Sequence, residues 1–111
     1  MENSIKVALA QINSKVGDLE YNYSKISKII KIAKKQKVDL LCFPELAITG
    51  YPPEDLLLNN KFIKSTDAFI KKITKLSKGI TCIIGYPKKI NDKLFNVAGI
   101  FLNGKLQGEY K

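Results

Sequence analysis

The stretch "VDLLCFPELAITGYPPEDLLL", from Val38 to Leu58, indicates the class of fold. It begins with an apolar run of strand length, "VDLLCF", which is typical of a strand buried on both faces of a parallel sheet. The carboxylate Glu45 follows almost at once, and the Tyr51-Pro52-Pro53 segment predicts a turn. Pro53, Glu54 and Asp55 then suit the start of a helix, because proline fits the first helical position and acids favour the positive end of the helix dipole.

Amphipathic helices are predicted on both sides of this stretch. From about Asn22, apolar residues recur at helical spacing, and lysines occupy the other face. A second helix is predicted over residues 61–78 after a short helical piece at "DLLLNN". The apolar positions of the two helices are Ile26, Ile29, Ile30 and Ala33 in the first, and Phe62, Phe69, Ile73 and Leu76 in the second.

Four further segments have strand character. They are residues 6–12, the buried run "GITCIIGY" at 79–86, and the two halves of "LFNVAGIFLNGKLQGEY", which divide at the hairpin signal Asn103-Gly104. Early strand–helix–strand alternation predicts parallel pairing, and the closing hairpin adds antiparallel strands. The sequence therefore predicts an α/β fold with a mixed sheet.

Length and composition are those of one small globular domain. The chain has 111 residues, of which 45% are hydrophobic and 26% charged. No apolar run approaches the roughly 20 residues that span a bilayer, and the N-terminus lacks a signal-peptide pattern. We therefore expect a cytoplasmic protein without a membrane segment.

The net charge of +9 is the balance of 19 basic and 10 acidic residues, and every basic residue is a lysine, since the chain has no arginine or histidine. Nucleic-acid surfaces usually include arginine for its bidentate contacts, so the composition favours solvated helix faces. A basic α/β binding module and a nucleic-acid surface remain the alternatives. Cys42 and Cys82 both lie in apolar runs without CxxC spacing, which predicts two core thiols and neither a disulfide nor a zinc site.

Glu45 is the candidate functional residue. Ligand sites of open α/β sheets gather at the carboxyl ends of strands, and Glu45 follows such an end. A lone glutamate at that position is more often solvated or caps a helix, so its position needs support from its surroundings.

Three segments together supply that support. "ALAQINSKVGDLEYN", "FPELAITGYPPEDLLL" and "FNVAGIFLNGKLQGEYK" resemble, in order and spacing, the nitrilase-like carbon–nitrogen hydrolases. The continuation "TGYPPEDLL" is similar to the glutamine-hydrolysing domains of glutamine-dependent NAD+ synthetases. The resemblance covers residues 1–111 and implies the first part of an αββα sandwich, cut after about five strands.

The resemblance also implies a chemistry. The family uses a Glu–Lys–Cys triad that hydrolyses the side-chain amide of glutamine and supplies ammonia for NAD+ synthesis. Glu45 matches the catalytic base, and Tyr51 matches a tyrosine close to the glutamine pocket. No metal ligand is implied within this chain. ATP and magnesium would belong to a synthetase domain that is absent from residues 1–111.

The other two members of the triad are not matched. Tyr110 and Lys111 correspond to the two residues before the catalytic lysine, so that lysine is expected just after Lys111, unless a shift of one position makes Lys111 its substitute. The nucleophilic cysteine is expected on a later strand, and neither Cys42 nor Cys82 matches it. The chain alone is therefore expected to be an inactive fragment of the enzyme.

Two kinds of partner remain open. The chain is either the leading piece of a glutamine amidohydrolase, completed by a complementary chain, or a non-catalytic remnant that pairs through an open sheet edge. The resemblance further implies a homo-oligomeric parent enzyme.

Overall fold

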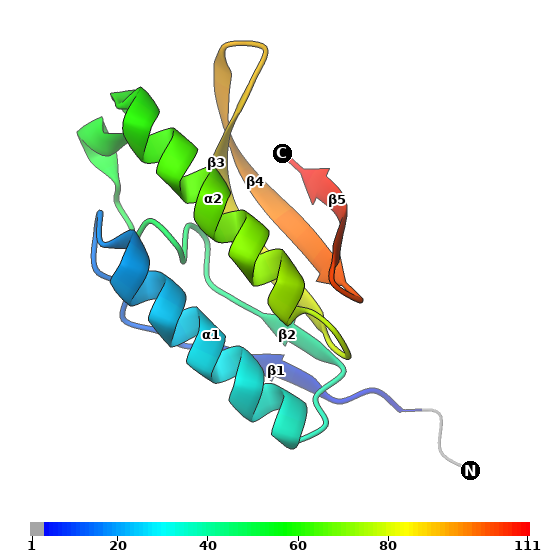
Figure 1. Ribbon diagram of the computed structural model, residues 1–111. Helices are drawn as coiled ribbons and strands as arrows, with labels where there is room; N and C mark the ends of the chain where they lie inside the picture. Colours follow the sequence, from blue (N-terminus) through cyan, green and yellow to red (C-terminus); the bar gives the residue numbers. More distant parts are fainter. Residues whose placement is uncertain (1–3) are drawn as a thin grey trace.

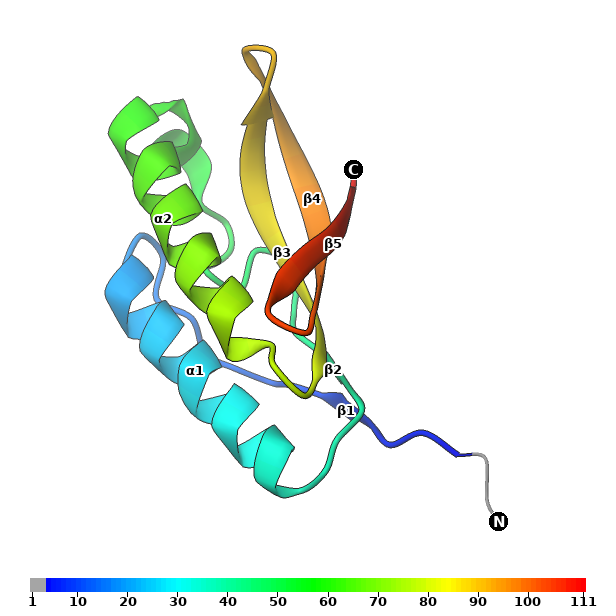
Figure 2. The same cartoon turned by 45° about the vertical axis from the view of Figure 1, so that its right-hand side comes forward.

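The computed structural model describes residues 4–111, which form one sheet with a layer of helices on one face (Figure 1, Figure 2). The strands are β1 (Val7–Leu9), β2 (Leu40–Cys42), β3 (Thr81–Ile90), β4 (Lys93–Leu102) and β5 (Lys105–Tyr110). The helices are α1 (Leu19–Lys35), the short 3₁₀ helix η1 (Glu54–Leu58) and α2 (Asn60–Leu76). Neither α1 nor α2 is long and apolar enough to cross a membrane.

The sheet is mixed, and its spatial order β1-β2-β3-β4-β5 follows the chain. β1, β2 and β3 run parallel, with Val7 opposite Leu40 and Leu40 opposite Thr81. β3, β4 and β5 are antiparallel neighbours. Parallel strands need a long crossover and antiparallel strands only a tight turn, which explains why the helices lie in the first part of the chain. The prediction of an α/β fold with a mixed sheet is confirmed.

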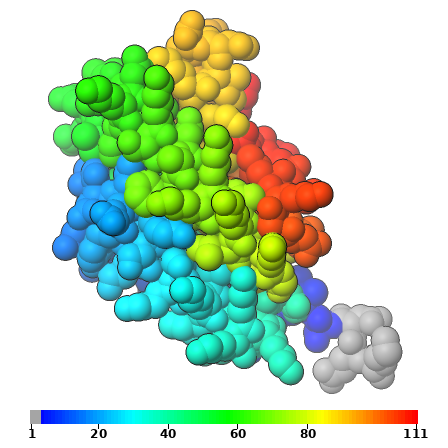
Figure 3. Space-filling model, viewed as in Figure 1, coloured from blue at the N-terminus to red at the C-terminus, as the bar shows by residue number. Residues whose placement is uncertain are grey.

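Side-chain caps fix where the helices begin. The Asp18 carboxylate accepts a hydrogen bond from the Tyr21 amide at the start of α1, and Asn59 caps α2 through the Phe62 amide. α1 thus begins at Leu19, before the predicted start near Asn22, because its first turn is held by the cap. The helices lie side by side, as the space-filling view shows (Figure 3), and the ribbon view places them over one face of the sheet (Figure 1).

The core lies between this helical layer and the sheet. Ile26 and Ile30 of α1, Ile73 of α2 and Ile84 of β3 are fully buried. The Tyr23 and Phe69 rings, 5.4 Å apart, join α1 to α2 above them. The predicted apolar faces of both helices are therefore the faces that pack, and most of the lysines are exposed on the solvent side.

Within residues 4–111, no helix covers the opposite face of the sheet. Val7 and Leu9 of β1 are 51% and 77% exposed there, and Leu40 and Cys42 of β2 are only half-buried. The expectation that the run 38–43 is buried on both faces is wrong for the described residues, because α1 and α2 cover one face only.

The β3–β4 hairpin is longer than the sequence indicates. β3 continues past Tyr86 and Pro87 to Ile90, and the chain reverses at Asn91 and Asp92, both with positive φ. The predicted reversal at Asn103-Gly104 is confirmed, with φ of 55° and 76°. Asparagine and aspartate tolerate positive φ without glycine, so the first reversal carries a weaker signal than the second.

Candidate functional site

Glu45 lies at the carboxyl end of β2. The Phe43 amide still donates to the Ile83 carbonyl at 2.9 Å, so the chain follows β3 until one residue before Pro44. The ladder stops at Pro44, which has no amide hydrogen to donate. Glu45 is exposed beyond this point, at the edge of the sheet where ligand sites of α/β proteins gather.

The segment after Glu45 is a buried and tightly bonded loop. Residues 46–50 are all buried, and Leu46 adopts a positive φ of 53°. The Gly50 amide donates to the Leu46 carbonyl at 2.9 Å, and the buried Thr49 hydroxyl lies within hydrogen-bond distance of the carbonyls of Leu46 and Gly50, at 3.3 and 3.1 Å. The loop therefore holds Glu45 on a fixed backbone.

Asn22 of α1 ties this loop to the rest of the molecule. Its fully buried side-chain amide donates to the Ile48 and Lys15 carbonyls, each at 2.8 Å, and its oxygen accepts from the Lys15 amide at 2.7 Å. The Ser14 hydroxyl donates to the Ala47 carbonyl at 2.6 Å. The sequence marked Asn22 only as the approximate start of a helix, although a polar residue on the apolar face of a helix is a signal of this kind of anchor.

A glycine allows β3 to approach Glu45 closely. A Cβ atom on Gly85 would come within 2.9 Å of the Leu46 nitrogen and 3.2 Å of the Glu45 Cα. Only a residue without a side chain therefore fits beneath the Glu45 backbone. The pattern of a buried strand predicted the position of Gly85 in the sheet but not this role.

The Glu45 side chain lies between two hollows on the molecular surface. The first has a volume of about 370 Å³ and is lined by Phe43, Glu45, Ile83, Gly85, Asn96, Val97, Ala98, Tyr110 and Lys111. The second, of about 180 Å³, is lined by Ile12, Asn13, Ser14, Pro44, Glu45, Leu46, Ala47, Gly50 and Tyr51. Tyr51, 70% exposed, thus shares a hollow with Glu45, and Tyr110 lies in the other.

Asn96 orients the Glu45 carboxylate. Its side-chain amide donates a hydrogen bond to Glu45 Oε1 from β4, across the first hollow. No sequence pattern predicts this contact, because Asn96 is 51 positions away and meets Glu45 only through the pairing of β3 with β4.

Lys111 lines the first hollow, but its ammonium group does not pair with Glu45. The Lys111 Nζ lies 4.3 Å from the centre of the Phe95 ring, in cation–π geometry. Within residues 4–111 the ion pair that the structure contains joins Lys88 to Glu109.

Neither cysteine lines a hollow beside Glu45, although Cys42 lies next to Phe43 and opposite Ile83, which line the first hollow. Both cysteines are free thiols; Cys82 is fully buried and Cys42 is half-buried. Burial raises the pKa of the Cys82 thiol to about 11, which keeps it protonated and poorly nucleophilic at neutral pH.

Comparison with known proteins gives the same family throughout. The carbon-nitrogen hydrolase family model matches residues 6–111. The chain belongs to the carbon-nitrogen hydrolase family. Within this family it is similar to the glutamine-dependent NAD(+) synthetases of Xanthomonas campestris, at 32% identity over 98% of the chain, and Thermotoga maritima, at 34% over 96%.

Solved structures of the family have the same fold. The chain superposes on a glutamine-dependent NAD(+) synthetase from Cytophaga hutchinsonii with a TM-score of 0.91 at 32% identity, over 95% of this chain and 18% of the other. An amidase from Nesterenkonia, at 19% identity, shares the fold with a TM-score of 0.79, over 96% of this chain and 42% of the other. The chain spans about a fifth of the length of its synthetase relatives, 20% of the Xanthomonas protein and 19% of the Thermotoga protein.

Proposed function

We propose that this chain supplies the base-bearing part of a glutamine-hydrolysing carbon-nitrogen hydrolase domain, with Glu45 as the general base. The observation that carries the proposal is the place of Glu45: a fixed loop holds its backbone, Asn96 holds its carboxylate, and a hollow opens on each side. A base held in this way is ready to accept a proton without reorganising. Similarity to glutamine-dependent NAD(+) synthetases supports glutamine as the substrate.

In the proposed reaction Glu45 takes the proton of a cysteine thiol as the sulfur attacks the carboxamide carbon of glutamine. The proton then passes to the departing nitrogen, which leaves as ammonia, and a thioester remains. Glu45 next takes a proton from water, whose oxygen attacks the thioester and releases glutamate and the thiol. Tyr51 is proposed to contact the substrate, since it shares the second hollow with Glu45.

The cysteine and the lysine of this reaction come, in the proposal, from outside residues 4–111. Neither the buried Cys82 nor the half-buried Cys42 lines a hollow beside Glu45, and burial keeps the Cys82 thiol protonated, so a different cysteine is proposed as the nucleophile. The Lys111 ammonium lies over Phe95, which supports a different lysine as the group that stabilises the oxyanion. We therefore expect no glutamine hydrolysis from this chain alone.

The ammonia is proposed to serve the amidation that completes NAD+, in a synthetase part that binds ATP and magnesium. The similarity of the chain to glutamine-dependent NAD(+) synthetases supports this step. The free thiols of Cys42 and Cys82 agree with the reducing environment of a cytoplasm.

The test measures ammonia release from glutamine after the chain is combined with a polypeptide that carries the remaining lysine and cysteine, or is expressed with the continuation of its own reading frame if there is one. We expect activity in the combination and a loss of about 10²- to 10⁴-fold for Glu45→Gln. Glu20→Gln, an exposed acid on α1, is the matched control and should retain activity.

Two outcomes would contradict the proposal. One is full activity of the Glu45→Gln combination. The other is silence of the wild-type combination when both polypeptides are folded and bound to each other. Silence with binding would instead favour a non-catalytic module that pairs through its open sheet, where Val7 and Leu9 are exposed.

A further inference from the structure

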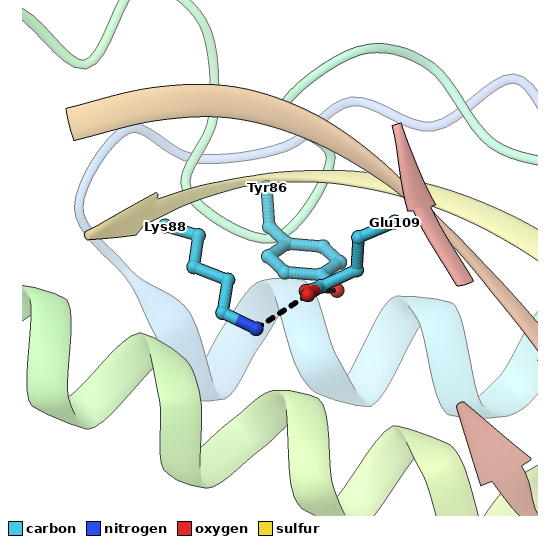
Figure 4. A network of polar contacts seen from close by, with 3 residues as sticks. All are labelled: Tyr86, Lys88 and Glu109. Carbon is cyan, nitrogen blue, oxygen red and sulfur yellow. Dashed lines mark hydrogen bonds and ion pairs between the residues drawn. The ribbon is translucent and has the colours of Figure 1, made fainter. Parts of the chain in front are cut away.

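A polar cluster lies on the helix-covered side of the sheet, away from Glu45. It consists of Tyr86 and Lys88 on β3 and Glu109 on β5. Figure 4 shows these three side chains. The Tyr86 hydroxyl donates to Glu109 Oε2, and the Lys88 ammonium donates to Glu109 Oε1. Both carboxylate oxygens of Glu109 are therefore held, each by a different residue of the same strand.

The cluster is partly enclosed. Tyr86 is 1% exposed, and the side chains of Glu109 and Lys88 are 19% and 35% exposed. Burial raises the pKa of Glu109, but the hydrogen bonds from Lys88 and Tyr86 and the charge of Lys88 outweigh it, so the pKa is lowered overall. The carboxylate is thus charged at neutral pH and bonded at both oxygens.

The sheet is shaped to admit the Tyr86 ring. A Cβ atom on Gly99 of β4 would lie 2.7 Å from both Cε1 and the hydroxyl oxygen of Tyr86. Phe101 packs beside the ring, at 6.2 Å between centroids. With Gly99 leaving this space, the buried hydroxyl reaches β5, two strands away from β3.

Besides this cluster, the end of β5 is held by its pairing with β4, in which Glu109 lies opposite Gly99 and Tyr110 opposite Ala98. β5 is an edge strand, and its ladder with β4 shifts register between Ile100 and Phe101. A hollow of about 340 Å³, lined by residues of α2, β3 and β5, lies between α2 and the end of the strand. The turn at Asn103-Gly104 therefore does not by itself determine which residues of β5 face the helices.

Strand alternation links this cluster to the Glu45 hollow. Successive residues of a strand project to opposite faces, so Glu109 projects toward the helices and Tyr110 away from them. Tyr110 pairs with Ala98, and both line the hollow that contains Glu45. Whatever holds Glu109 on one face thus determines where Tyr110 lies on the other.

We infer that Tyr86, Lys88 and Glu109 are positioning residues that fix the register of the end of β5 and thereby place Tyr110 in the wall of the Glu45 hollow. The catalytic meaning of this placement rests on the proposed function, whereas the placement itself is a property of the chain. Loss of the cluster should release the end of β5 while β3 and β4 remain paired.

The experiment uses NMR of the 111-residue chain. In the wild type we expect nuclear Overhauser contacts between the Tyr110 ring and the Ala98 methyl group, and slow amide exchange at Gly108 to Tyr110. In Glu109→Ala and in Tyr86→Phe, we expect these contacts to disappear and exchange to accelerate roughly 10- to 100-fold, while β3–β4 amides stay protected. Lys105→Gln, an exposed residue of the same strand, is the matched control and should leave both signals unchanged.

The contacts distinguish positioning from stability alone, because a folded but less stable chain would keep them. Retention of the Tyr110–Ala98 contacts and of β5 protection in both variants would overturn the inference. If Glu109→Ala does not fold, Glu109→Gln decides in its place: partial loss of the contacts supports the inference, and full retention overturns it. None of these readouts depends on activity, so they stand or fall separately from the role of Glu45.

Discussion

Glu45 owes its position to residues that have no reactive group. Gly85 makes room for its backbone, Asn96 bonds its carboxylate, and Thr49 closes the loop behind it. Of the site, the sequence predicted Glu45 at the end of a strand and Tyr51 in the turn that follows, and both line one hollow. It did not predict Gly85 or Asn96, because their contacts exist only once the register of β2, β3 and β4 is set.

Gly85→Ala should displace the backbone that carries Glu45. The added Cβ meets backbone atoms of Leu46 and Glu45, which cannot rotate away as a side chain could, so we expect a loss of about 1–3 kcal/mol in unfolding free energy. Urea denaturation measures this loss of unfolding free energy. Gly108→Ala is the matched control, because its Cβ would meet only the Tyr110 side chain at an ordinary 3.7 Å. Equal stability of the two variants would contradict the close approach of β3 to Glu45.

At the scale of elements, α1 does more than cover the sheet. Through Asn22 it bonds the loop behind Glu45, so the helix is connected directly to the segment that carries the site. The sequence predicts α1, because the helical spacing of apolar residues such as Ile26, Ile30 and Ala33 depends only on local chain geometry. The sequence does not predict the role of Asn22, since its partners come from a loop 26 residues later.

Asn22→Ala should therefore be costly. It leaves a buried carbonyl of Ile48 and two half-buried backbone groups of Lys15 without their partner, which predicts a loss of about 2–4 kcal/mol in unfolding free energy. Thermal or urea denaturation followed by circular dichroism measures the loss. Ser24→Ala, at an exposed position of α1, is the control and should change little. A loss below about 0.5 kcal/mol for Asn22→Ala would show that water replaces these bonds.

The two hairpins also differ in how far local sequence predicts them. Asn103-Gly104 was readable because the glycine permits positive φ, and the structure turns there. The turn at Asn91-Asp92 was missed, since Pro87 and the lysines beside it argue against a continuing strand. Pairing with β4 over ten residues holds β3 through this weak sequence, which is a tertiary effect.

At the scale of the whole molecule, titration of a few carboxylates affects the stability of the fold in acid. The folded pKa of Glu109 lies below its ordinary value of 4.5, so its contribution is fully present above that pH and is lost as pH falls through the lowered value. Asp67 on α2 acts in the opposite sense. Burial raises its pKa above 3.8 despite the nearby Lys88 and Lys71, so protonation favours the fold.

We therefore expect Glu109→Gln to lose less melting temperature than the wild type between pH 6 and pH 3. Asp67→Asn should lose more over the same interval, because it lacks the compensating protonation. Calorimetry or circular dichroism at a series of pH values measures both differences. Equal acid losses in all three proteins would contradict the charge state assigned to the cluster of Tyr86, Lys88 and Glu109.

The alternation of Glu109 and Tyr110 across β5 has a consequence for how this chain tolerates insertions and deletions. One residue gained or lost between Lys105 and Glu109 would turn the rest of β5 to the opposite face of the sheet. Glu109 would then project into the Glu45 hollow and Tyr110 toward the helices. The tip of the β3–β4 hairpin has no such restriction, because it extends beyond the helices (Figure 1), and its turn residues Asn91 and Asp92 line neither the Glu45 hollow nor the hollow beside α2. Changes in chain length are therefore compatible with the site at the first hairpin and incompatible with it in the last strand.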